Sequence, residues 1–109
     1  MQLDREKFYT AIYEFLSEEL TPVQAENQSA VMVDNILSCV SKINKLMAIS
    51  STDPKTLSKE FHILKNLLLY GDFYYESDLC QDIEIELRKS KKISNVLSMY
   101  EELINSLKM

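Results

Sequence analysis

The only histidine of the chain, His62, is the residue best suited to carry out chemistry. It lies within residues 61–66 (FHILKN), on the polar side of an otherwise apolar helical pattern. An imidazole in water is largely uncharged at pH 7, so one ring nitrogen keeps an electron pair that can attack phosphorus. Lys65 follows at a spacing that brings side chains together on a helix, and its ammonium can stabilise phosphoryl oxygens. On spacing alone, a surface histidine with no role remains an equal alternative.

Four further residues around His62 are candidates for contact with a partner protein. At about 100° per residue, one side of the helix is apolar and is expected to face the core: Leu57, Phe61, Leu64 and Leu68. Asn66 lies nearly opposite this stripe, and Lys59 borders the same outer region. Ile63 and Leu69 add apolar surface that a docked partner could cover. We therefore expect a partner to contact Lys59, Ile63, Asn66 and Leu69.

Most other site chemistries are excluded by composition. One histidine, one glycine and two separated cysteines cannot supply a zinc tetrad, a phosphate-binding glycine loop or a Cys-His pair. Cys39 and Cys80 lack the CxxC spacing and are predicted to be small core residues in a reducing compartment. Two carboxylate pairs are interpreted as solvated helix faces: Glu84 with Glu86, and Glu101 with Glu102. No metal and no cofactor are expected.

Length and charge limit the class of protein. The chain has 109 residues, 46% of them hydrophobic and 27% charged, as expected for one globular domain. Its single glycine and two prolines favour long helices. A net charge of −5 disfavours nucleic acid and anionic membranes as partners, so a protein partner is expected. The early charged residues and the lack of a long apolar run predict a cytoplasmic protein without a signal peptide or membrane span.

The N-terminal half contains two predicted helices. The first begins at an Asp4 N-cap and ends near Leu20. The second starts at Thr21 and Pro22, with a glutamine three residues after the cap, and residues 26–29 are expected to kink or interrupt it. Apolar residues then recur every three or four positions from 29 to about 48.

Three more helices are predicted in the C-terminal half. Asp53 and Pro54 are expected to open a helix that ends near residue 70, with Gly71 as its left-handed C-terminal residue. The last two helices are expected to cover about 75–89 and 92–108. Residues 29–109 are thus predicted to form an all-α, antiparallel (up-down-up-down) four-helix bundle, and residues 1–28 an additional N-terminal helical segment of the same domain.

Three short stretches of the chain resemble the histidine phosphotransfer (HPt) domain family. They are His62-Ile63-Leu64-Lys65, Leu69-Tyr70-Gly71 and Cys80-Gln81-Asp82-Ile83-Glu84. They match a His-x-Leu-Lys-Gly box, a glycine closing that helix, and a Cys-x-x-Leu/Ile-Glu pattern, and the similarity covers about residues 30–108. The resemblance implies a monomeric phosphorelay protein whose His62 exchanges a phosphoryl group with the aspartate of a response-regulator receiver domain or hybrid histidine kinase. Lys65 would lie beside the phosphate, and Mg²⁺ would belong to the receiver.

Two alternatives to phosphotransfer remain open. The family has a glycine after the lysine, followed by small residues. In this chain those positions are Asn66, Leu67 and Leu68. A degenerate, non-catalytic adaptor that binds a receiver or kinase would tolerate these changes. Residues 62–68 also resemble the phosphoacceptor box of histidine-kinase dimerisation domains. That reading ranks lower, because Ile63 replaces the usual acidic residue and no ATP site is recognisable.

Overall fold

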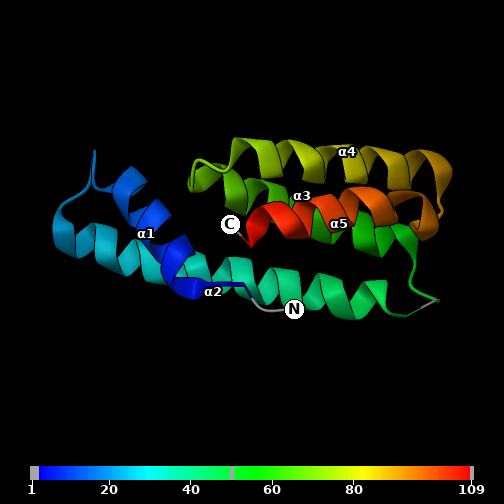
Figure 1. The fold of residues 1–109 in the computed structure, drawn as a ribbon, viewed down its shortest axis with the longest axis horizontal. Coiled ribbons are helices and arrows are strands. Elements are labelled where there is room, and N and C mark those ends of the chain that lie inside the picture. Colours follow the sequence, from blue (N-terminus) through cyan, green and yellow to red (C-terminus); the bar gives the residue numbers. More distant parts are fainter. Residues whose placement is uncertain (1–2, 50, 109) are drawn as a thin grey trace.

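The computed structural model describes residues 3–49 and 51–108, which contain five α-helices, one 3-10 turn and no β-strand (Figure 1). The elements are α1 (Arg5–Leu16), α2 (Pro22–Met47), α3 (Pro54–Tyr70), α4 (Tyr74–Ser90), η1 (Ile93–Val96) and α5 (Leu97–Leu107). The predicted all-α class is confirmed. None of the helices in this description combines the length and apolar character needed to cross a lipid bilayer.

The starts of α1, α2 and α3 follow the predicted capping residues. The Asp4 carboxylate accepts hydrogen bonds from two backbone N–H groups of the first turn of α1. Thr21 and Gln24 form a reciprocal capping box before α2. Asp53 accepts a 3.2 Å hydrogen bond from the backbone N–H of Lys55, while Pro54 occupies the first position of α3. Each cap satisfies backbone donors that the helix itself leaves unpaired.

The helices of the N-terminal half differ from the prediction in two places. Helix α1 ends at Leu16 rather than near Leu20, and the chain turns there with a 3.0 Å bond from the Leu20 N–H to the Leu16 carbonyl. Helix α2 continues through residues 26–29 without the interruption that was one of the two expectations there, and the predicted start of the bundle at residue 29 lies inside this helix. The small side chains of Ala25 and Ser29 are buried in the part of α2 that lies beside α1 (Figure 1). This packing stabilises a helix that the polar sequence alone does not favour.

The turn after α3 also differs from the prediction. Gly71 has a φ of −100°, and the left-handed residue is Asp72, with a φ of 68°. Glycine is required at 71 for space, because a Cβ there would lie 2.7 Å from the Phe73 ring and 2.9 Å from Cγ1 of Ile12. The turn closes with a 3.0 Å hydrogen bond from the Phe73 N–H to the Leu68 carbonyl.

The last predicted helix is divided in two. Residues 93–96 form the 3-10 turn η1, and α5 begins only at Leu97. Lys91 ends α4 in the left-handed conformation, with a φ of 57°. The short turn buries Val96 and leaves Leu97 exposed.

One apolar cluster joins all five helices, and it fixes the orientation of α3. The predicted stripe of α3 is buried in this cluster: Leu57, Phe61, Leu64 and Leu68. Cys39 and Cys80 are buried and unbridged, as predicted. The most extensive helix contact is between α3 and α4, while α2 packs on α3, and α5 on α4 (Figure 1). Because one side of α3 is buried, its opposite side faces solvent and carries His62.

Candidate functional site

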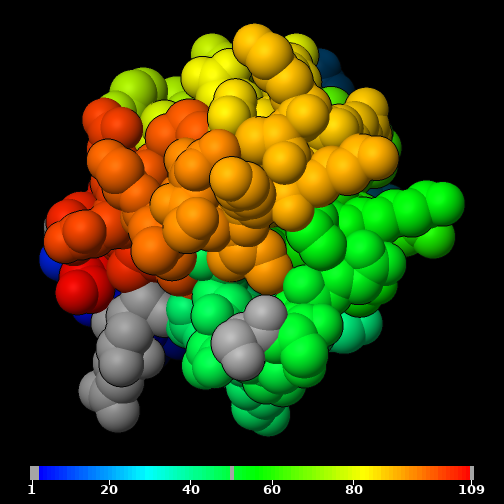
Figure 2. Space-filling view, turned by 90° about the vertical axis from the view of Figure 1, so that its right-hand side faces the viewer, coloured from blue at the N-terminus to red at the C-terminus, as the bar shows by residue number. Residues whose placement is uncertain are grey.

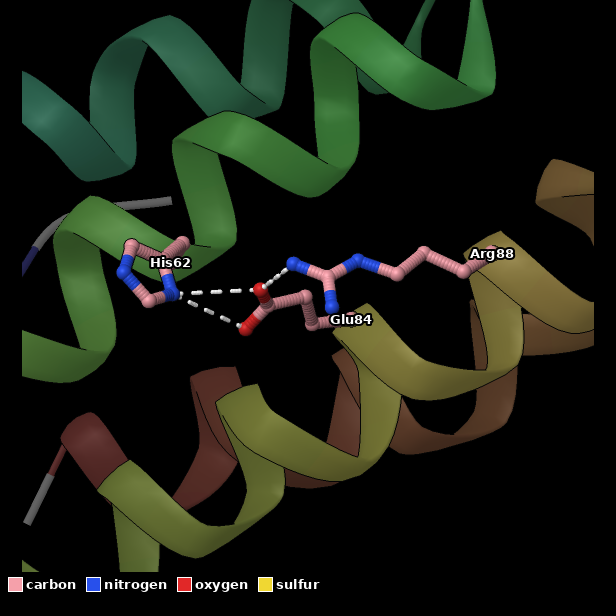
Figure 3. A network of polar contacts seen from close by, with 3 residues as sticks. All are labelled: His62, Glu84 and Arg88. Atoms are coloured by element: carbon pink, nitrogen blue, oxygen red, sulfur yellow. Dashed lines mark hydrogen bonds and ion pairs between the residues drawn. The ribbon is translucent and has the colours of Figure 1, made fainter.

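His62 lies on the solvent side of α3, at the edge that meets α4. Its side chain is 49% exposed. The ring nitrogen Nδ1 is 3.1 Å and 3.3 Å from the two carboxylate oxygens of Glu84 on α4 (Figure 3). The histidine is therefore accessible from solvent, while Glu84 holds its ring from one side. A surface histidine without a partner would be free to rotate.

Glu84 is buried, and the prediction that it lies on a solvated helix face was wrong. Its side chain is only 4% exposed. A buried carboxylate is costly unless it is paired, and Glu84 has two partners. One is His62, and the other is Arg88, one helical turn further along α4, whose side chain is 67% exposed (Figure 3). Glu84 thus connects the histidine to a cation at the surface.

The spacing along α4 contains a signal for this burial. Glu84 lies four residues after Cys80 and three before Leu87, both of which were predicted to face inward and are buried. It therefore shares their side of the helix. A carboxylate in the middle of an inward-facing stripe indicates a buried polar contact. The burial of Glu84 was not predicted because Glu84 and Glu86 were interpreted together as a solvated helix face.

The contact with Glu84 determines which nitrogen of His62 can react. The Nδ1–H donates to the carboxylate, and in this tautomer the electron pair resides on Nε2. Nε2 lies on the far side of the ring from Glu84 (Figure 3) and has no hydrogen-bond partner among residues 3–49 and 51–108. A carboxylate bound to one imidazole nitrogen fixes the tautomer and the orientation of the ring. Nε2 therefore carries the free electron pair and points away from Glu84.

Lys65 lies three residues after His62 on α3, as expected, and is half-buried. Its ammonium forms no ion pair with any side chain in the described ranges. Its backbone carbonyl accepts a 3.1 Å hydrogen bond from the Ser77 hydroxyl on α4, which ties the two helices together beside His62. The lysine charge is therefore available to an anion that approaches this face.

The four predicted contact residues are all exposed on α3. Lys59, Ile63, Asn66 and Leu69 have exposed side chains, and Ile63 and Leu69 are among the large exposed apolar residues of the molecule. We call these four residues the docking face. Of the bulky residues that replace the small residues of the HPt pattern, Leu68 is fully buried and Leu67 half-buried. Of these three positions, Asn66 is the exposed one.

Three exposed tyrosines lie next to the turn between α3 and α4 and were not singled out from the sequence. Tyr70, Tyr74 and Tyr75 surround the turn between α3 and α4, just after Leu69. The Tyr75 hydroxyl donates a 2.5 Å hydrogen bond to Glu102, and this contact raises the pKa of the tyrosine. Aromatic residues are frequent in protein interfaces, so a group of tyrosines at one exposed turn is a signal that the sequence offered.

No three His, Cys, Asp or Glu side chains in the described part of the chain lie close enough to hold a metal ion together. Comparisons with protein-family models, with curated proteins and with solved structures found no match for this chain. The function is therefore argued from the geometry around His62.

Proposed function

We propose that this protein is a histidine phosphotransfer protein that carries a phosphoryl group on Nε2 of His62. The observation that carries the proposal is the pairing of an accessible imidazole with a buried carboxylate, 3.1 Å from Nδ1 to Glu84. In this proposal α2, α3, α4 and α5 form the up-down-up-down bundle of the HPt type. Helix α1 is an addition to it, and the protein acts as a cytoplasmic monomer.

The transfer is a displacement at phosphorus. The Nε2 electron pair attacks the phosphoryl group of an aspartyl phosphate on the receiver domain, an N–P bond forms, and the P–O bond to the aspartate breaks. The aspartate leaves as a carboxylate. The imidazole ring keeps its Nδ1 proton and becomes positively charged, and the Glu84 carboxylate stabilises that charge. The reverse displacement returns the phosphoryl group to an aspartate.

Lys65 has a separate role in this proposal. Its ammonium stabilises the negative oxygens of the phosphoryl group during transfer. The Mg²⁺ that such a transfer needs would be held by the receiver domain, so this chain would supply only the nucleophile, the carboxylate and the lysine. No ATP-binding site is required, because the phosphoryl group comes from a partner.

A receiver domain, or the receiver of a hybrid histidine kinase, is the proposed partner at the docking face. Ile63 and Leu69 offer apolar surface there. Lys59 and Lys65, neither of which forms an ion pair with a described side chain, add positive charge in a chain of net charge −5. Such a surface suits a partner with an acidic, partly apolar face.

Phosphate transfer from receiver domains tests the proposal. The purified protein is mixed with each phosphorylated receiver of its source organism, and a base-stable, acid-labile label is expected with at least one. His62→Gln is expected to abolish the label while circular dichroism shows the same helix content. Lys45→Gln, a change at an exposed lysine on α2, is the matched control and should keep it. If no receiver labels the wild-type protein, the proposal is wrong.

A non-catalytic adaptor is the second candidate, and it is favoured by the apolar and aromatic surface around Leu69. An adaptor would bind a receiver or kinase through the docking face without carrying phosphate. In that case His62→Gln would leave the affinity unchanged, whereas Leu69→Glu would weaken it. Retention of the label by wild type and loss by His62→Gln would exclude the adaptor.

A further inference from the structure

We infer that a basic pocket next to the His62 network binds a small organic anion, such as a phosphate monoester with an aromatic or aliphatic group. The pocket lies between the first turns of α3 and the last turns of α4 and has a volume of about 550 Å³. That volume is within the range of pockets that hold small-molecule ligands. Figure 2 looks onto this end of the molecule, where the start of α3 (green) meets the end of α4 (gold).

The pocket wall is strongly positive. Four cationic side chains line it: Lys55, Lys59, Arg88 and Lys91. No described acidic residue forms an ion pair with any of the three lysines. Asp53 is the acidic residue of the lining, and its carboxylate is already bonded to the backbone N–H of Lys55 as the α3 cap. The pocket therefore has an excess of positive charge in an acidic protein, which favours an anion.

The floor of the pocket is apolar. Leu87 is almost completely buried and lines it together with Pro54, which is half-buried. The accessible apolar surface here comes from Pro54 and from the aliphatic stems of the lining lysines, and a purely inorganic anion would leave it in contact with water. An organic group attached to the anion would cover it, and that burial adds to the affinity. The combination of a cationic wall and an apolar floor selects an amphipathic anion over free phosphate.

Arg88 connects this pocket to His62. The same guanidinium lines the pocket and pairs with Glu84, which accepts the Nδ1–H of His62. An anion bound at Arg88 competes with Glu84 for that guanidinium. Glu84 would then depend more strongly on His62, and the imidazole environment would change although the ligand does not touch the ring. The anion site itself does not depend on phosphotransfer.

Binding is tested with phenyl phosphate as the probe and ¹⁵N NMR of the full chain as the readout. We expect saturable shifts at the start of α3 and the end of α4. The double variant Lys55→Glu/Lys91→Glu should weaken binding about tenfold or more. The double variant Lys45→Glu/Lys89→Glu makes the same charge change at lysines outside the pocket lining and should weaken it less. No saturable shift, or equal weakening by both double variants, would overturn the site.

Two further comparisons separate the parts of the inference. Inorganic phosphate should bind more weakly than phenyl phosphate, and equal affinity would overturn the role of the apolar floor. The imidazole ¹⁵N signals of His62 should shift when phenyl phosphate saturates the pocket and should stay fixed in Glu84→Gln. Fixed signals in the wild type would overturn the coupling through Arg88. None of these readouts requires phosphotransfer, so failure of the phosphorelay proposal and failure of the anion site are distinguishable.

Discussion

Replacement of Arg88 by alanine tests whether the buried charge of Glu84 depends on its two partners. Removing one partner of a buried ion pair typically costs about 3–5 kcal/mol. The cost here is smaller, because Arg88 is 67% exposed and the Nδ1–H of His62 still donates to the carboxylate. We expect Arg88→Ala to lower the free energy of unfolding at pH 7 by about 1–2 kcal/mol, within the range for an under-satisfied buried group.

Urea unfolding of single and double variants measures this effect. Glu84→Gln removes the charge that Arg88 compensates, so Arg88→Ala should cost less than about 0.5 kcal/mol in the Glu84→Gln background. Arg88→Met, which keeps the aliphatic stem, is the control for lost packing. If Arg88→Ala is equally destabilising with Gln at 84, or if Arg88→Met is as stable as the wild type, the loss comes from packing and the reasoning from buried charge is refuted.

Three other predictions follow from the structure. In the phosphotransfer proposal, Glu84→Gln should slow the transfer to His62 about tenfold with little change in the fold, because a neutral amide stabilises the positively charged ring less than a carboxylate does. Single-turnover labelling with a phosphorylated receiver measures the rate, and an unchanged rate would contradict the role of the carboxylate. Gly71→Ala should destabilise the protein by about 1–3 kcal/mol, since its Cβ would overlap the Phe73 ring; thermal unfolding reports the loss, and an unchanged midpoint excludes the clash. Burial raises the pKa of the Cys39 thiol to about 11, so between pH 9 and 11 the folded state keeps a proton that the unfolded thiol, with a pKa of 9.0, releases. The free energy of unfolding should therefore fall as the pH rises from about 9 to about 11, and it should fall less steeply in Cys39→Ala; an identical slope in the wild type and the variant would contradict this cause.

The exposed side of α3 could be predicted from the sequence because the signal is local. The apolar stripe of α3 repeats with the helical period, so its buried side, and by difference the exposed position of His62, follow from residues within one helix. The caps at Asp4, Thr21 and Asp53 are local in the same sense. Each capping side chain bonds a backbone N–H that lies two or three residues further along the chain.

The features that were missed depend on contacts between distant parts of the chain. The burial of Glu84 requires α3 and α4 to meet with His62 beside it, a contact between residues 22 positions apart. The need for glycine at 71 comes from Ile12 on α1 and Phe73, rather than from a left-handed backbone. The continuity of α2 depends on its packing beside α1. Local sequence patterns do not show which distant residues come into contact. The sequence therefore indicated the accessible histidine but not the carboxylate that orients it.

The energetics of Glu84 favour a functional role over a structural one. A leucine at this position would be buried between Cys80 and Leu87 without the desolvation cost of a carboxylate, and such replacements of buried ion pairs are often neutral or stabilising. Stability alone therefore gives no reason for a glutamate there. What the carboxylate does provide is a fixed Nδ1 proton and an outward-facing Nε2 on His62. Arg88 compensates the buried charge of Glu84, and it also lines the basic pocket. In our proposal, an anion bound in that pocket would therefore change the surroundings of His62 through the same guanidinium.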